Sequence, residues 1–197
     1  MLIVVRHGRT ATNAAGRLLG RADPSLDDLG RQQAAATADH LLETMRPARV
    51  VCSPLARTRE TAEAFGLPVT VDERWIELDY GSLEGTKLVE VPKDYWQRWQ
   101  SDIDFAPEGG ESLSGLGERV RAACEDLADE AAEADVVVVS HVSPIKAAVA
   151  WALGVDDQVS WRMFVAPASI TKISTSGPRR SLHGFNGSDH LGGLGGG

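Results

Sequence analysis

The sequence predicts an α/β domain with a mostly parallel central sheet that is flanked by helices on both faces. Three short apolar runs, at residues 2–5, 49–53 and 135–140, are typical of buried strands, and the last contains four consecutive valines. Each run is separated from the next by stretches with helical spacing of apolar residues, an alternation that favours parallel strands. The 197 residues are 43% hydrophobic and 24% charged, enough for one domain with a sizeable core.

The first half of the chain begins with the strand at 2–5 and continues into a polar, glycine-containing loop over 7–25. From Leu29 onward, apolar residues recur three to four positions apart and predict a helix. The strand at 49–53 then precedes a second helix over 54–65, which has a proline near its first turn.

The second half starts with the least regular region, 69–111, in which Tyr95, Trp96 and Trp99 share one helical face. These aromatic residues fit either a wall of the ligand site or a helix packed on the core. The remaining elements are a long amphipathic helix over 111–134, the valine strand, a helix over 144–153, and two strands at 162–165 and 169–174. We expect one domain over 1–176 and a flexible, polar and glycine-rich C-terminal tail over 177–197.

The net charge of −8 argues against nucleic acid or an anionic membrane as a partner, because the basic residues are scattered. No long apolar stretch or leader pattern is evident before Arg6, so we expect a cytoplasmic protein. The two cysteines form no disulfide framework. The five histidines show no paired-ligand spacing, and we expect neither a metal nor another cofactor. The oligomeric state stays open.

Side chains suited to binding phosphate follow three of the predicted strands. The first strand ends in Arg6 and His7, the second leads to Arg57, and the valine strand ends next to His141. Because the carboxyl ends of parallel strands meet at one edge of a sheet, we expect these groups to converge. Guanidinium groups match phosphate oxygens in a fork, and an imidazole can act as a nucleophile or a proton carrier. Singly, each would be an ordinary polar residue, but together they predict a phosphate site.

The stretch 6–10, Arg-His-Gly-Arg-Thr, followed by Asn13, resembles the signature of the histidine phosphatase superfamily, in the branch that includes cofactor-dependent phosphoglycerate mutases. The resemblance covers the chain from Met1 to about Ser174 and implies a phosphoglycerate mutase-like fold. Further markers occur in the order of the family, at 20–30, 53–61, 77–85, 109–112 and 140–141.

This resemblance implies that His7 attacks phosphorus in line and carries the phosphoryl group as a covalent phosphohistidine. It also implies that Arg6, Arg57 and His141 bind the phosphate, with Asn13 as a neutral donor. Such a pocket is physically sound, because the transition state spreads negative charge over three equatorial oxygens.

The leaving alkoxide needs a proton, and the family pattern assigns Glu77 as the general acid. Asp79 is the alternative, with Glu84 also nearby. The sequence departs from the common pattern at Arg9, where Glu or Gln is frequent, and at Lys146, where an arginine is frequent. Arg9 adds positive charge at the mouth of the site and favours a substrate with a second anionic group. Lys146 supplies charge without the forked geometry.

The sequence favours a phosphomonoester hydrolase that acts on a small phosphorylated metabolite. The alternative is a phosphoglycerate mutase-type phosphotransferase, which would have a longer segment between Glu77 and His141 to enclose its substrate. A non-catalytic binding module of the same fold is a distant alternative, because neither the nucleophile nor the arginines have been lost. The identity of the substrate, among sugar phosphates, phosphoglycerates, nucleotide-like phosphomonoesters and cobalamin-pathway phosphates, is not encoded in these motifs.

Overall fold

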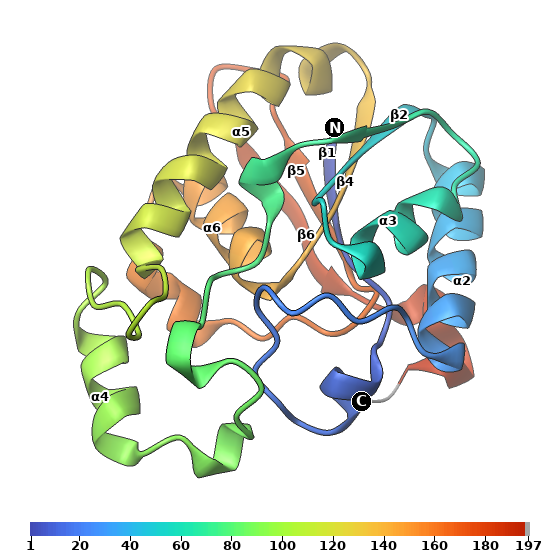
Figure 1. Cartoon of the computed structure of the whole chain (residues 1–197). Helices are drawn as coiled ribbons and strands as arrows, with labels where there is room; N and C mark the ends of the chain where they lie inside the picture. The colour runs from blue at the N-terminus through green and yellow to red at the C-terminus, as the bar shows by residue number, and fades with distance from the viewer. Residues whose placement is uncertain (196–197) are drawn as a thin grey trace.

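A computed structural model describes residues 1–195 and contains a six-stranded sheet in the order β3-β2-β4-β1-β5-β6 (Figure 1). The strands are β1 Leu2–Arg6, β2 Pro47–Cys52, β3 Val69–Val71, β4 Asp135–Ser140, β5 Ile170–Ser174 and β6 Ser181–Gly187. Strands β1 to β4 pair in parallel, whereas β5 is antiparallel to both β1 and β6. The predicted mostly parallel sheet is therefore confirmed.

Six α-helices and five 3-10 helices surround the sheet within residues 1–195. The α-helices are α1 Ala11–Ala14, α2 Asp28–Thr44, α3 Ala56–Glu63, α4 Lys93–Ser101, α5 Leu113–Glu133 and α6 Val142–Leu153. The 3-10 helices are η1 Glu73–Trp75, η2 Gly81–Leu83, η3 Leu88–Glu90, η4 Asp157–Arg162 and η5 Asp189–Leu194. In this part of the chain, every helix is too short or too polar to cross a bilayer.

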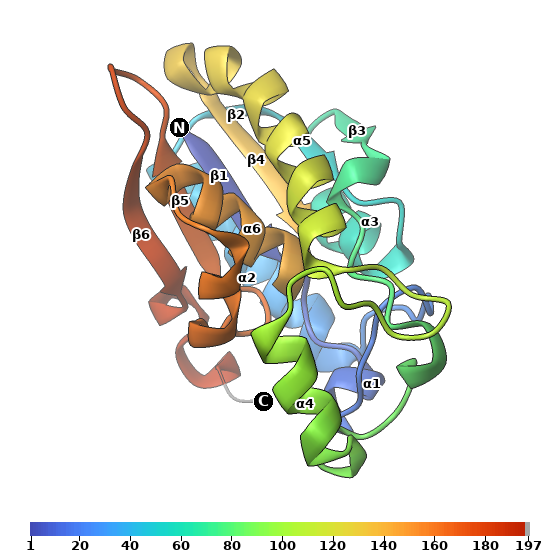
Figure 2. The ribbon, with the colours of Figure 1, turned by 90° about the vertical axis from the view of Figure 1, so that its left-hand side faces the viewer.

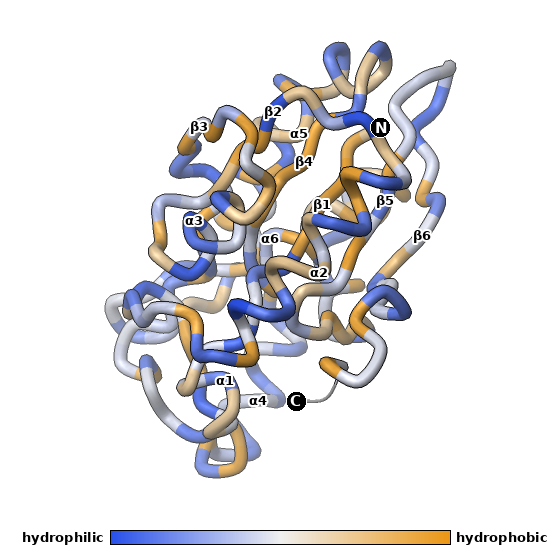
Figure 3. Tube along the Cα trace, turned by 90° about the vertical axis from the view of Figure 1, so that its right-hand side faces the viewer, coloured by the Kyte–Doolittle hydropathy of each residue, from blue (hydrophilic) through white to orange (hydrophobic). Residues whose placement is uncertain are grey.

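The sheet is covered on both faces, because side chains alternate across each central strand. Leu2 and Val4 of β1 face the core that α5 and α6 complete, whereas Ile3 and Val5 face α2 and α3. Figure 1 shows these two helix pairs on opposite sides of the sheet, and Figure 3 shows the hydrophobic residues concentrated in the central strands. The apolar runs of the sequence are thus explained by strands buried on both faces.

Strands β1 and β4 are neighbours whose carboxyl ends lie level, since Arg6 pairs with Ser140 in the register. The chain continues from these ends into His7 and His141, so one edge of the sheet receives both histidines. Figure 2 shows α1 and α4 beyond this edge, where they form the outer wall of the site.

The structure differs from the sequence-based expectations at three places. Strand β3 lies in the region expected to be irregular; it has only three residues, Val-Thr-Val, all of them exposed, so its pattern is too short to predict a strand. Residues 162–165 do not form the expected strand, because Met163, Phe164 and Val165 line a cavity instead.

The third difference concerns the expected flexible tail. Residues 181–187 form β6 and pair with β5, and 189–194 form η5 against α2. An edge strand is held by backbone hydrogen bonds and requires little apolar sequence, which explains why the composition gave no signal. Residues 196–197 of the expected tail lie outside the described residues.

Candidate active site

His7 occupies the first position after β1 and is held on both sides by the backbone. Its amide donates to the carbonyl of Ser140 (3.0 Å), and its carbonyl accepts from the amide of Ala168 (3.1 Å). The ring Nδ1 lies 2.7 Å from the carbonyl oxygen of Gly8. Because a carbonyl only accepts, Nδ1 carries the proton and the lone pair is on Nε2. The geometry therefore assigns Nε2 as the nucleophilic atom.

The electrostatic surroundings keep this imidazole neutral. Burial lowers the pKa of His7 well below the ordinary value of 6.5, and the positive charges of Arg57 and Arg6 lower it further. The side chain is only 3% exposed. An unprotonated ring at neutral pH is the state that can attack phosphorus.

Arg6 and Arg57 are anchored by backbone carbonyls rather than by carboxylates. Arg6 donates from Nη1 to Val165 (2.6 Å), and Arg57 donates from Nη1 and Nη2 to Ala22 and Gly20 (both 2.8 Å). Carbonyl groups orient the two guanidinium groups without neutralising them. Burial lowers the pKa of Arg6 to about 10, so the group is still protonated at neutral pH.

Three buried donor atoms at this edge have no hydrogen-bond partner among the described residues: Nε of Arg6, Nε of Arg57 and Nδ1 of His141. Unpaired buried donors are costly, and native proteins keep few of them. Donors of this kind, two of them on cationic groups, fit an anion that has several acceptor oxygens. They indicate a phosphate-sized ligand site.

His141 follows β4 and precedes α6, and its ring centroid lies 5.1 Å from that of His7. Its Nε2 lies 2.7 Å from the Oγ of Ser53, which follows β2. Burial lowers the pKa of His141 well below 6.5, and the positive charge of Arg57 lowers it further. Ser53 lies in the family-like stretch 53–61, but the sequence assigns it no role. Its contact with His141 joins residues that follow two different strands, β2 and β4.

Glu77 is buried (3% exposed) and lies at the amino end of α6. Its carboxylate accepts from the amides of Leu78 (2.7 Å) and Ser143 (3.1 Å). Glu77 and His7 line the same cavity. The sequence-based alternatives are engaged elsewhere: Asp79 accepts from the amide of Gly81, and Glu84 accepts from the amides of Gly20 and Arg21. The geometry therefore favours Glu77 over both.

Arg119 of α5 holds the segment that carries Glu77, a role that the sequence did not reveal. Its Nη1 donates to the carbonyls of Arg74 (2.6 Å) and Ile76 (2.7 Å). Its Nε and Nη2 form a bidentate pair with Glu111 (2.7 and 2.8 Å). Only the tertiary structure brings α5 to this loop, so no local pattern could have identified Arg119.

The central cavity has a volume of about 380 Å³. The candidate residues that line it are Arg6, His7, Asn13 and Glu77. Arg57 and His141 are completely buried and lie behind the lining. Asn13 accepts from the amide (3.1 Å) and hydroxyl (2.9 Å) of Thr10 through Oδ1, so its amide nitrogen remains to serve as the neutral donor.

Arg9 and Lys146, the two cations at which the sequence departs from the family pattern, have different surroundings. Arg9 lines the cavity, but its Nε donates to Asp27 Oδ2 at 2.8 Å, so the positive charge expected at the mouth is offset by a carboxylate. Lys146 of α6 also lines the cavity. Burial lowers the pKa of Lys146, although the charge of Glu77 opposes that shift.

Within residues 1–195, no group of three or more His, Cys, Asp or Glu side chains is arranged to hold a metal ion. The donor atoms at the edge of the sheet are N–H groups, which bind anions. Metal-independent chemistry stays a prediction that a chelator can test.

The sequence model of a protein family, the histidine phosphatase superfamily (branch 1), matches residues 2–188 of this chain. Bifunctional protein Rv2228c of Mycobacterium tuberculosis (strain H37Rv) is 35% identical over 177 residues, which are 86% of this chain and 49% of that protein. The chain thus spans about half the length of this relative. Phosphoserine phosphatase 1 of Hydrogenobacter thermophilus is 34% identical over 201 residues, covering 97% of this chain and 94% of the relative.

Solved structures have the same architecture. The mycobacterial glucosyl-3-phosphoglycerate phosphatase Rv2419c, in its complex with VO3, has a TM-score of 0.85 and 30% sequence identity. The match covers 95% of this chain and 99% of that one. The fold around the site is therefore shared with proteins of this kind.

Proposed function

The chain belongs to branch 1 of the histidine phosphatase superfamily, and from this we propose that it hydrolyses small phosphomonoesters through a phosphohistidine on His7. The observation that carries the proposal is the convergence of a neutral, oriented imidazole with unpartnered buried donors of Arg6, Arg57 and His141. A nucleophile and a set of anion-binding donors at one site are what phosphoryl transfer requires.

In the first step, Nε2 of His7 forms a bond to phosphorus while the bond from phosphorus to the ester oxygen breaks. Arg6, Arg57 and His141 bind the phosphoryl oxygens, whose negative charge they stabilise. Glu77, in its protonated form, donates a proton to the departing alkoxide. In the second step, Glu77 takes a proton from water, and the water oxygen bonds to phosphorus while the bond from phosphorus to Nε2 of His7 breaks. Inorganic phosphate leaves, and His7 is again neutral.

A phosphoglycerate mutase must hold a phosphorylated carboxylate and retain the phosphoryl group. Beyond the phosphate end, the cavity is lined by apolar side chains and also by the cations Arg9, Arg17 and Lys146. The preference for hydrolysis is supported instead by the similarity to phosphoserine phosphatase 1 and to the glucosyl-3-phosphoglycerate phosphatase.

The test is release of inorganic phosphate from phenyl phosphate and from 3-phosphoglycerate by the wild type and by His7→Ala. We expect wild-type turnover and a loss of about 10³-fold or more in the variant. Labelled substrate should leave an acid-labile phosphoryl group on the wild type only. EDTA should leave the rate unchanged, and orthovanadate should inhibit.

Two outcomes contradict the proposal. Near-normal turnover by His7→Ala would exclude His7 as the nucleophile. Turnover of 3-phosphoglycerate only in the presence of 2,3-bisphosphoglycerate, without phosphate release, would assign a mutase.

We also propose the cytoplasm as the location and a small molecule as the partner. The observation that supports this location is that Cys52 and Cys124 are buried, free thiols. The net charge of −8 argues against nucleic acid as a partner.

A further inference from the structure

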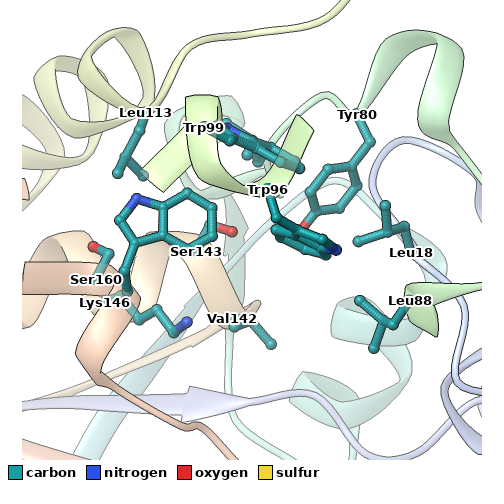
Figure 4. Close-up of a pocket in the computed structure, with 12 residues that line it drawn as sticks. Leu18, Tyr80, Leu88, Trp96, Trp99, Leu113, Val142, Ser143, Lys146 and Ser160 are labelled. Atoms are coloured by element: carbon teal, nitrogen blue, oxygen red, sulfur yellow. The ribbon is translucent and has the colours of Figure 1, made fainter. Parts of the chain in front are cut away.

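A second pocket, of about 180 Å³, adjoins the cavity that contains His7. The two share five lining residues, namely Leu18, Tyr80, Leu88, Val142 and Lys146, so they are continuous. Figure 4 shows Trp96 and Trp99 facing Val142 and Lys146 across this space. A phosphate ester held at His7 would therefore direct its organic group into this pocket or past its entrance.

The walls of the pocket are aromatic and fixed relative to one another. Trp96 stacks on Trp99 of the same helix α4, with ring centroids 5.5 Å apart and an interplanar angle of 19°. Trp161 of η4 packs edge-on against Trp99 at 5.5 Å. The ring of Tyr80 also packs edge-on against Trp99, with ring centroids 5.7 Å apart. Packed rings of this kind have little freedom and present a preformed apolar surface.

Three residues that line this pocket each carry one buried polar atom that has no hydrogen-bond partner within residues 1–195. These atoms are Nε1 of Trp99, Oγ of Ser160 and Nε1 of Trp161. All three residues line the aromatic pocket, and none lines the cavity of His7. These residues therefore belong to the part of the pocket remote from His7. Two of the three atoms are obligate donors, so the group that satisfies them must carry an acceptor.

The entrance combines apolar and cationic side chains. Leu88 and Phe164, which line the cavity of His7, are 46% and 67% exposed, and Arg9, Arg17 and Lys146 line the same cavity. The three tryptophans of the aromatic pocket, by contrast, line only that pocket, so its far part is where an apolar group fits.

We infer that the aromatic pocket binds the organic group of the substrate, and that this group is an aromatic or compact apolar alcohol with an acceptor oxygen remote from the phosphate. The inference rests on the proposed function. A cavity of about 150 Å³ lined by apolar side chains holds benzene. The aromatic pocket thus has room for one ring with a small substituent.

Binding of phosphonates tests the inference without turnover, because the carbon–phosphorus bond is not hydrolysed. The probes are 4-acetylbenzylphosphonate, 4-ethylbenzylphosphonate and 3,4-dihydroxybutylphosphonate, measured by calorimetry with the wild type. We expect both aryl compounds to bind about 50-fold more tightly than the diol, from the apolar area that they bury. The acetyl compound should bind about tenfold more tightly than the ethyl compound, from its acceptor.

Trp161→Phe and Ser160→Ala remove one polar group each and retain most of the packing. We expect the ratio of the acetyl to the ethyl affinity to decrease in each variant. A change in packing affects both compounds, so the ratio isolates the lost polar group. Trp151→Phe is the matched control, because the indole of Trp151 donates to Glu125 away from the pocket. Binding of 4-ethylbenzylphosphonate by each variant shows that its pocket is still folded.

Equal or tighter binding of the diol by the wild type would overturn the inference. An acetyl preference that survives in both Trp161→Phe and Ser160→Ala would overturn the role of the unpaired groups. Hydrolysis is scored separately on benzyl phosphate and glycerol 3-phosphate. Tight aryl binding without hydrolysis of either ester refutes the proposed activity alone, whereas hydrolysis without an aryl preference refutes the assignment of the pocket alone.

Discussion

His141 and Ser53, 88 residues apart in the sequence, meet with 2.7 Å between Nε2 and Oγ. The amide of Leu55 points at the same hydroxyl oxygen (3.4 Å), so the hydroxyl proton is available to the imidazole. When the hydroxyl donates to Nε2, the ring proton is on Nδ1, the atom that has no partner in residues 1–195. Ser53 is thus a positioning residue for the phosphate donor that we propose at His141.

Ser53→Ala should weaken phosphate binding about tenfold, since one hydrogen bond to the imidazole is lost. The inhibition constant of inorganic phosphate and KM should both rise, and kcat should change less. Thermal unfolding gives the control, because a merely structural role would lower the stability and leave the inhibition constant unaltered. Ser53→Thr retains a hydroxyl group and should recover part of the affinity.

Glu77→Gln should slow alkyl phosphates by about 10²- to 10⁴-fold and affect aryl phosphates far less. An aryl oxide leaves without proton assistance, so only the alkyl esters depend on the acid. The measurement is kcat for benzyl phosphate and for 4-nitrophenyl phosphate, with Asp79→Asn as the matched variant. Equal losses on both esters in Glu77→Gln would assign the proton donor to another group.

Stability should decrease as the pH falls below about 6.5. Burial lowers the pKa values of His7 and His141 in the folded protein, whereas in the unfolded chain both are near 6.5. Below that pH the unfolded state takes up protons that the folded state does not, so the free energy of unfolding falls by about 1.4 kcal/mol per pH unit for each histidine. This loss continues down to the lowered folded pKa values.

Urea unfolding at pH 7.5, 6.5 and 5.5 measures this dependence. His141→Gln should remove about half of the difference attributed to the two histidines. The same substitution at the exposed His183 is the control and should retain the wild-type slope. An unaltered slope in His141→Gln would mean that His141 is not held neutral.

Gly8→Ala should destabilise the protein by about 1–3 kcal/mol, because a methyl group there would overlap the backbone of α2. A Cβ at Gly8 would lie 2.2 Å from the carbonyl oxygen of Gly30. Gly184→Ala is the matched control, since a Cβ at Gly184 would meet no atom within 4 Å. The midpoints of urea unfolding compare the two, and an equal effect of both would refute the close approach.

Much of the fold and the convergence of His7 and His141 could be predicted, because the signals are local. Strands β1, β2 and β4 are continuous apolar runs, and His7 and His141 follow two of them directly. The edge strands β3 and β6 were not predicted for different reasons. Strand β3 has only three residues, and β6 is held by main-chain pairing and has exposed or half-buried residues without an apolar pattern. The run at 162–165 was misleading because its apolar residues face a cavity rather than a sheet neighbour.

Contacts between distant segments were beyond the sequence. Arg119 reaches the segment of Glu77 from α5, and Ser53 reaches His141 across two strands. The aromatic residues Trp96 and Trp99 were noted as a possible wall or as core, and the structure gives them both positions: Trp99 is 1% exposed and packed, yet both line a pocket. The pocket also needs Trp161 of η4, which packs against Trp99 and lines it.

The phosphate-binding groups and the aromatic pocket are built on different parts of the molecule. His7 and His141 are fixed to the ends of central strands, whereas Trp96 and Trp161 lie on α4 and η4, outside the sheet. Libraries that randomise these two peripheral segments would therefore sample new carrier groups while the reacting atoms keep their places. We therefore expect substrate range and chemical rate to be separable in this architecture.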